Sequence, residues 1–229
     1  MITETRKKRS VRSFVRRSGR LTPAQERAMR ELWPRFGIDP GDSTDDLDET
    51  VGRRAPRILE IGFGDGETLV QQAVARPDAD FLGIEVHEPG IGHCLLRAAK
   101  ADVTNLRVMA MDAIDVLRER IAPGTLTRIN LYFPDPWPKK RHHKRRIVND
   151  AFLGLCGRCL ATGGHLHIAT DWAGYAEHID EALARTDLFR PVERRQHAGD
   201  APLERPVTKF ERRGLARGHQ IVDWKLERI

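Results

Sequence analysis

The chain has 229 residues, of which 40% are hydrophobic and 31% are charged, and its formal net charge is +6. This length fits one domain with short extensions, and the composition is that of a globular protein with a sizeable core. The sequence has no run approaching the ~18 apolar residues of a membrane span, and its start, MITETRKKRS, lacks the apolar region of a secretory signal, so we expect a cytoplasmic protein.

Positive charge is concentrated in two runs. Residues 1–20 contain eight Arg or Lys and one Glu, and residues 139–146 (KKRHHKRR) contain six Arg or Lys and no acid. Together the runs carry a net +13, so the rest of the chain carries a net −7. Such runs suit a phosphate backbone, although a solvated surface and a disordered tail would have the same composition. We expect residues 1–20 to be a mobile basic arm and residues 21–229 to be a single domain.

In chain order, the first predicted element is a helix over about residues 22–36. Thr22 is a suitable N-cap, Pro23 suits the first helical position, and Gln25 completes a capping box. The polar, acidic stretch at about 39–50 predicts a linker. Short apolar runs then alternate with helical patterns. The expected strands are 57–61, 81–86, 106–110, 128–133 and 165–170, and the expected helices are about 67–75, 90–101, 113–118, 147–160 and 173–185.

This alternation of strands and helices predicts an α/β fold with a mostly parallel, Rossmann-like sheet covered by helices on both faces. The final stretch, 219–229, alternates like a terminal antiparallel strand. Residues 196–205 match no pattern and receive no prediction.

Acids and glycines follow the first three predicted strands, where open α/β sheets bind ligands. The first strand ends in Glu60, followed by Gly62, Gly64 and Gly66. This ExGxGxG spacing differs from the GxGxxG of nicotinamide-binding loops and resembles the first motif of class I methyltransferases. Glu85 follows the second strand, where an acid can accept hydrogen bonds from ribose hydroxyls.

Asp112 follows the third strand, where it could meet an adenine amino group or simply cap the next helix. Together with Glu60, Glu85 and the three glycines, it predicts a site for a nucleotide-type cofactor.

The loop after the fourth strand, FPDPWPK, holds one acid, Asp135, among three prolines. Proline fixes φ, so the loop should be stiff and should hold Asp135 beside the cofactor, facing the acceptor. Trp137 could stack on a base or pack under the loop. The basic run, including Lys139, Arg145 and Arg146, follows directly and should supply phosphate contacts.

This loop carries the most specific resemblance in the sequence. PDPWPKKRHHKRR resembles the signature of the bacterial tRNA (guanine-N7)-methyltransferase family, and RSFVRRSGRLTPAQ, EIGFGDG, GIEVH, TDW and TKFE match it in the same order. The resemblance extends from about residue 12 to residue 229. Pro138 stands where some members have His.

The resemblance implies a class I methyltransferase with a seven-stranded sheet, S-adenosylmethionine as cofactor and tRNA as the macromolecular partner. The methyl group would go to N7 of a guanosine in the variable loop. Glu60, Glu85 and Asp112 would bind the cofactor with the glycine loop, and Asp135 would be the active-site acid beside it. Substrate contacts would come from Lys139, Asp171, Thr208, Lys209, Phe210 and Glu211. RNA contacts would come from Arg141, His142, His143, Lys144, Arg145 and Arg146.

Several of these residues also have simple structural interpretations. Asp171 and Trp172 could be a helix N-cap and a core side chain, and Lys209 and Glu211 could form a surface ion pair. The CGRC pair at Cys156 would need a second pair to bind zinc, so we expect buried thiols and no metal. No obligate protein partner is evident.

Three other functions compete with the methylation of guanine N7. They are a nicotinamide-dependent oxidoreductase, a methyltransferase for an exocyclic amino group or another base atom, and a non-catalytic RNA-binding protein that retains a methyltransferase fold. The glycine spacing and the PDPW loop count against the first, and the acids at the strand ends count against the last.

Overall fold

The structure, a computed structural model, describes residues 13–14, 19–41, 53–199 and 204–229. Most of the expected basic arm (1–20) and of the expected acidic linker (39–50) lies outside these ranges. Within them, no helix has the length and apolar character needed to cross a membrane.

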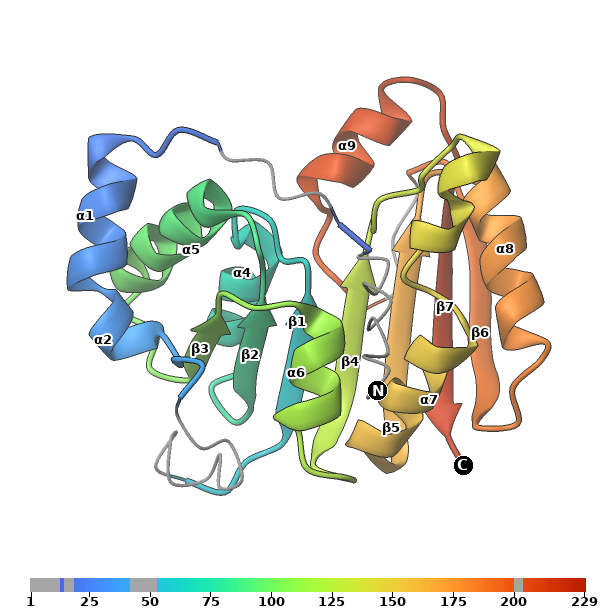
Figure 1. Ribbon diagram of the computed structural model, residues 1–229, viewed down its shortest axis with the longest axis horizontal. Helices are drawn as coiled ribbons and strands as arrows, with labels where there is room; N and C mark the ends of the chain where they lie inside the picture. The colour runs from blue at the N-terminus through green and yellow to red at the C-terminus, as the bar shows by residue number, and fades with distance from the viewer. Residues whose placement is uncertain (1–12, 15–18, 42–52, 200–203) are drawn as a thin grey trace, which may run out of the picture.

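The described strands form one seven-stranded sheet in the order β3-β2-β1-β4-β5-β7-β6 (Figure 1). Neighbouring strands from β3 to β5 pair in parallel, and β7 pairs antiparallel with both β5 and β6. The bounds are β1 Arg57–Ile61, β2 Asp80–Ile84, β3 Leu106–Met109, β4 Leu126–Tyr132, β5 Leu160–Thr170, β6 Phe189–His197 and β7 Ile221–Arg228. The predicted fold class and the antiparallel terminal strand are confirmed.

β6 is a strand that the sequence did not predict. Its sequence, FRPVERRQH, is mostly exposed, because β6 lies at the edge of the sheet and pairs only with β7. Charged residues and proline are tolerated at sheet edges, and they hide the apolar alternation of a strand.

The helices follow the predicted order. Their bounds are α1 Pro23–Glu31, α2 Trp33–Phe36, α4 Glu67–Ala75, α5 Glu88–Lys100, α6 Ala113–Glu119, α7 Asp150–Cys159, α8 Ala173–Leu183 and α9 Lys209–Leu215, with a 3₁₀ helix, η1, at Lys140–Arg145. The capping box of Thr22 and Gln25 is present. The single helix expected over 22–36 is interrupted at Leu32, just before Trp33 and Pro34.

The start of α7 also differs from the expectation. The helix begins at Asp150, not at Ile147, because the side chain of Asn149 accepts a hydrogen bond from Phe152 N (3.1 Å) and caps it there.

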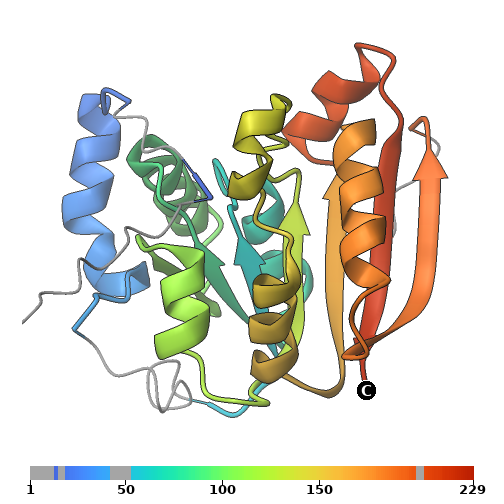
Figure 2. The ribbon, with the colours of Figure 1, turned by 45° about the vertical axis from the view of Figure 1, so that its right-hand side comes forward.

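Helices cover both faces of the sheet (Figure 2). One core unites side chains of α6, α7 and α8 with one face, represented by Val116, Phe152 and Ile179. A second core unites α1, α2, α4 and α5 with the other face near β1–β3, represented by Phe36 and Leu95. This arrangement leaves the carboxyl ends of β1–β5 at one edge, where the predicted site residues lie.

Candidate active site

The glycine loop after β1 turns through three left-handed residues, Gly62, Gly64 and Gly66, with φ of 73°, 61° and 73°. A Cβ on Gly66 would lie 2.5 Å from the Cβ and Sγ of Cys94 on α5, so only glycine fits there. At Gly62 a Cβ would meet no atom within 4 Å, so the backbone there is open to close approach by a ligand. The loop therefore has the shape of a backbone cradle.

Glu85 lies at this cradle, as the sequence predicted for a cofactor-facing acid. Its Oε2 accepts a hydrogen bond from Gly64 N (2.9 Å), and its Oε1 accepts from Val86 N (2.7 Å) and His87 N (3.0 Å). The carboxylate is thus fixed between the glycine loop and the start of α5.

Glu60 lies beneath the loop and not at its surface. Its side chain is buried, and it accepts hydrogen bonds from Thr68 Oγ1 (2.8 Å) and Gln72 Nε2 (3.2 Å) of α4. Burial raises the pKa of Glu60 to about 7, although the hydrogen bonds from Thr68 and Gln72 oppose the rise. In this structure Glu60 joins β1 to α4 and supports the loop from below.

Asp112 caps α6, since its side chain accepts a hydrogen bond from Ile114 N at 3.0 Å. It also lines a small cavity with Ser13, Arg118 and Lys144, so it lies where the N-terminal segment meets the basic loop. The capping interpretation is confirmed, while contact with an adenine stays a prediction.

Asp135 is exposed on the loop that follows β4. Phe133 N donates to Ala169 O (2.8 Å) and extends the pairing of β4 with β5, and Phe133 then adopts a left-handed φ of 52°. A side chain in the left-handed region is strained and is held there only by its surroundings. The chain leaves the sheet sharply at this point and presents Asp135 at the carboxyl edge.

Trp137 packs within this loop. Its Nε1 donates to Ser13 O (3.1 Å), and the guanidinium of Arg145 lies 5.1 Å from its ring. His142 meets the same ring edge-on, with 5.8 Å between the ring centroids. Trp137 therefore packs within the loop, as one of its two interpretations predicted, and stacking of its ring on a base stays a prediction.

Arg146 differs from the other cations of the basic run because it is buried. Its Nε donates to Pro136 O and its Nη1 to Gly174 O, each at 3.0 Å, and its guanidinium lies 5.0 Å from the Tyr175 ring. The prediction that Arg146 contacts RNA conflicts with this burial, so we assign it to holding the loop on α8.

The TKFE stretch begins α9 with a capping box. Thr208 Oγ1 accepts from Glu211 N (3.0 Å) and Glu211 Oε2 accepts from Thr208 N (3.4 Å), and both side chains are buried. Lys209 Nζ lies 3.8 Å from Asp65 Oδ2, whereas Glu211 pairs with Arg205, so the alternative interpretation of Lys209 and Glu211 as a surface ion pair is wrong.

α9 packs against the glycine loop. The Phe210 ring, half exposed, lies against Gly64, and Arg212 Nη2 is 2.7 Å from Glu67 Oε2 at the start of α4. The predicted substrate residues therefore lie beside the predicted cofactor residues, at one edge of the sheet.

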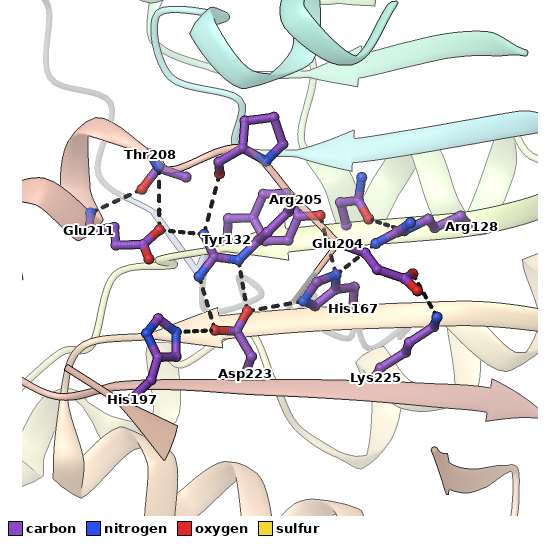
Figure 3. Close-up of polar contacts among 12 residues, drawn as sticks. Arg128, Tyr132, His167, His197, Glu204, Arg205, Thr208, Glu211, Asp223 and Lys225 are labelled. Carbon is purple, nitrogen blue, oxygen red and sulfur yellow. Dashed lines mark hydrogen bonds and ion pairs between the residues drawn. The ribbon is translucent and has the colours of Figure 1, made fainter. Parts of the chain in front are cut away.

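A buried polar network lies between β5, β7 and the segment before α9 (Figure 3). Asp223 accepts from His167 Nε2 (3.0 Å), His197 Nε2 (3.1 Å), Arg205 Nε (2.7 Å) and Arg205 Nη2 (3.0 Å). Burial opposes ionisation of Asp223, but the hydrogen bonds from His167 and Arg205 outweigh it and hold its pKa well below the ordinary value.

Arg205 connects this network to α9 and to the end of β4. It pairs with Glu211 of α9 through Nη1, and its guanidinium lies 5.3 Å from the Tyr132 ring and 5.4 Å from the Phe133 ring. Arg205 has no sequence-based prediction, because no local pattern marks a cation that is buried by Glu211 and by the more distant Asp223 and Tyr132.

The interpretation of Asp171 as the N-cap of α8 and of Trp172 as a core side chain is wrong. Trp172 is the N-cap residue and is 37% exposed. Instead, Asp171 Oδ2 lies 3.1 Å from His219 Nδ1, and Gly214 of α9 packs against the same carboxylate. Asp171 is therefore at the same edge as α9.

Cys156 and Cys159 are free and buried, as predicted, and Cys94 is also free and buried. In the part of the chain that the structure describes, no group of three or more His, Cys, Asp or Glu side chains could hold a metal ion.

Comparisons with known proteins agree with this geometry. A family model described as a putative methyltransferase matches residues 54–224. A "tRNA (guanine-N(7)-)-methyltransferase" from Alkalilimnicola ehrlichii is 54% identical over 219 residues, which are 94% of this chain and 92% of that protein. The chain belongs to the tRNA (guanine-N7)-methyltransferase family. The family resemblance of the PDPW loop is thereby confirmed.

Another family member, from Halorhodospira halophila, is 52% identical over 216 residues, which are 94% of each chain. Among solved structures, an antibiotic-related methyltransferase superposes with a TM-score of 0.61 at 14% identity, covering 84% of this chain and 97% of that one. The antibiotic-resistance methyltransferase Kmr gives a TM-score of 0.59 at 16% identity, covering 84% and 95%. At these identities the structures support the methyltransferase fold alone.

Proposed function

We propose that this protein transfers the methyl group of S-adenosylmethionine to N7 of a guanosine in tRNA, in the variable loop, and that it acts in the cytoplasm. The observation that carries the proposal is 54% identity over nearly the whole chain to a protein named for this reaction. The clustering of Glu85, Asp135, Asp171 and α9 at one edge of the sheet supports it independently.

The carboxyl edge fits the cofactor. The open backbone at Gly62 allows close approach. Glu85, beside the glycine loop, would accept hydrogen bonds from ribose hydroxyls, and Asp112, which follows β3, would meet the adenine. When bound, the cofactor supplies a methyl group on a sulfonium, which is a strong electrophile. Glu60 supports the loop and adds a buried acid below it.

Guanine N7 carries a lone pair in the plane of the ring, so no proton has to leave before it attacks. Catalysis then depends mainly on aligning the nucleophile with the methyl group. As the reaction proceeds, positive charge moves onto the guanine ring. An exposed carboxylate at the site, Asp135, stabilises that charge and orients the base without acting as an obligatory general base.

The substrate is held by residues on both sides of Asp135. Lys139 ends the Asp135 loop, Asp171 follows β5, the neighbour of β4, and the first turn of α9, Thr208 to Glu211, lies next to the glycine loop. Thr208 and Glu211 are buried and shape this turn, while Lys209 and Phe210 are exposed and can reach the nucleotide. The exposed cations Arg141 and Lys144 contact the RNA backbone. His142 and Arg145 pack against Trp137 beside them, and His143 lies beside Arg146.

The decisive experiment is to incubate the purified protein with unmodified tRNA and methyl-labelled S-adenosylmethionine, and then treat the RNA with borohydride and aniline, which breaks strands at N7-methylguanosine. Label with scission at one position supports the proposal. Label without scission moves the acceptor to another atom. Cofactor binding without label on any tRNA supports a non-catalytic RNA-binding protein.

A further inference from the structure

The outer surface of α9 carries two arginines that the proposed site does not use. Arg213 lies in α9 and Arg217 in the turn that follows, four residues later, and both are exposed. Neither makes an ion pair with a carboxylate of the described residues. From Lys209 to Gly218 the one acid is Glu211, which is buried against Arg205, so every exposed charge of this segment is positive.

Other residues of the segment are fixed against the site. Glu211 pairs with Arg205, and Gly214 packs against Asp171 so closely that a Cβ on Gly214 would lie 2.7 Å from Asp171 Oδ2. Arg212, between them and Arg213, reaches back to Glu67. Residues four apart on a helix lie on the same side, so Arg213 shares the side of the exposed Lys209, and Arg217 is exposed in the turn that ends the helix.

Exposed arginines at the other edge of the sheet are arranged differently. Arg185 pairs with Asp150 and Arg190 pairs with Glu227, each at 2.9 Å. Their charges are neutralised locally by those carboxylates. Arg213 and Arg217 have no such carboxylate partner among the described residues, so their charges are available to a polyanion.

Two cationic elements therefore border the acceptor site. η1 follows the Asp135 loop, and α9 packs over the glycine loop, and both lie at the edge where β4 ends (Figures 1 and 2). β1 and β4 are neighbours in the sheet, so the two elements lie close to each other across the site.

We infer that Arg213 and Arg217 of α9 bind tRNA phosphates on the side of the acceptor guanosine opposite to η1. The inference rests on the proposed function and adds a second phosphate-binding surface to it. The added phosphate contacts raise the affinity of the protein for tRNA without touching the reacting base.

The test compares R213Q/R217Q with the control R185Q/R190Q, which also removes two positive charges but at the opposite edge. Binding of unmodified tRNA is measured by fluorescence anisotropy over a range of salt concentrations. The association constant falls as salt rises, and each lost phosphate contact reduces the magnitude of the slope of its logarithm against log salt by roughly 0.7 to 0.9. R213Q/R217Q should therefore reduce that magnitude by about 1.4 to 1.8. The control should keep the wild-type slope, and R213K/R217K should restore it, since lysine also neutralises phosphate.

Methylation kinetics separate this role from a folding defect. In R213Q/R217Q the KM for tRNA should rise by roughly tenfold or more, while kcat at saturating tRNA and the affinity for S-adenosylhomocysteine stay at the wild-type values. A wild-type slope in R213Q/R217Q, or an equal loss in the control, would overturn the inference. The slope decides this irrespective of the methylated atom, so a failure of the proposed reaction would be recognised separately.

Discussion

Replacing Arg205 by methionine would test how far the buried network holds this fold together. The Arg205 side chain is 0% exposed, and it donates to Asp223 through two nitrogens and to Glu211 through a third. Methionine fills similar space but leaves both carboxylates without their cation. Removing one partner of a buried ion pair costs about 3–5 kcal/mol of unfolding free energy, because the other charge stays buried and unpaired.

The loss should also depend on pH. In the folded wild type the pKa of Asp223 is held low. Ionised Asp223 therefore contributes to the unfolding free energy at pH values above its pKa in the unfolded chain, and this contribution is lost as pH falls through its pKa in the folded protein. Without Arg205 that pKa rises and the ionised form becomes costly. Arg205→Met should therefore destabilise the protein more at pH 8 than at pH 4.

Urea unfolding followed by circular dichroism at both pH values measures this effect. The matched control is Arg190→Met, which removes an exposed arginine that pairs with Glu227 on β7, the strand that also carries Asp223. Exposed pairs contribute about 0–1 kcal/mol, so the control should unfold almost like the wild type. A loss below about 1 kcal/mol in Arg205→Met, or a loss equal at both pH values, would refute the reasoning.

Three further substitutions address single residues of the site. Glu60→Gln should flatten the pH dependence of stability. Because the pKa of Glu60 in the folded protein is raised to about 7, the wild-type unfolding free energy falls by on the order of 3 kcal/mol as pH rises from 4.5 through 7. The same pH dependence of the unfolding free energy in both proteins, measured by urea unfolding, would contradict this. Asp135→Ala should lower single-turnover methylation by roughly 10²–10³ while calorimetry finds cofactor affinity nearly unchanged; equal losses would make Asp135 only a cofactor ligand. Arg146→Lys should lower the melting temperature, since lysine cannot make the guanidinium contacts, whereas Lys144→Ala should weaken tRNA binding at an unchanged melting temperature; the reverse pattern would overturn both assignments.

The sequence by itself determined the fold class and the edge that carries the site. Strand and helix periodicities are local, so apolar runs such as 57–61 and the capping box at Thr22 could be identified without knowing what they pack against. Parallel strands end at one edge, so Glu85 and Asp135 could be placed together before any coordinates were known.

The local sequence also contains a signal for the start of α9. Thr208 and Glu211 have the spacing of a capping box, which marks the start of α9. The predictions for these two residues were substrate contacts and, for Glu211, a surface ion pair with Lys209.

Tertiary structure alone decided the rest, because the deciding contacts join residues far apart in the chain. β6 is a strand because it pairs with β7, although its own residues are mostly exposed and charged. Asp223 meets His167 across 56 positions, and Arg146 is buried by α8, although its neighbours in the basic run are exposed or only partly buried. Which cation of a basic run faces RNA and which one supports the loop depends on these packing partners, and a run of similar letters does not distinguish them.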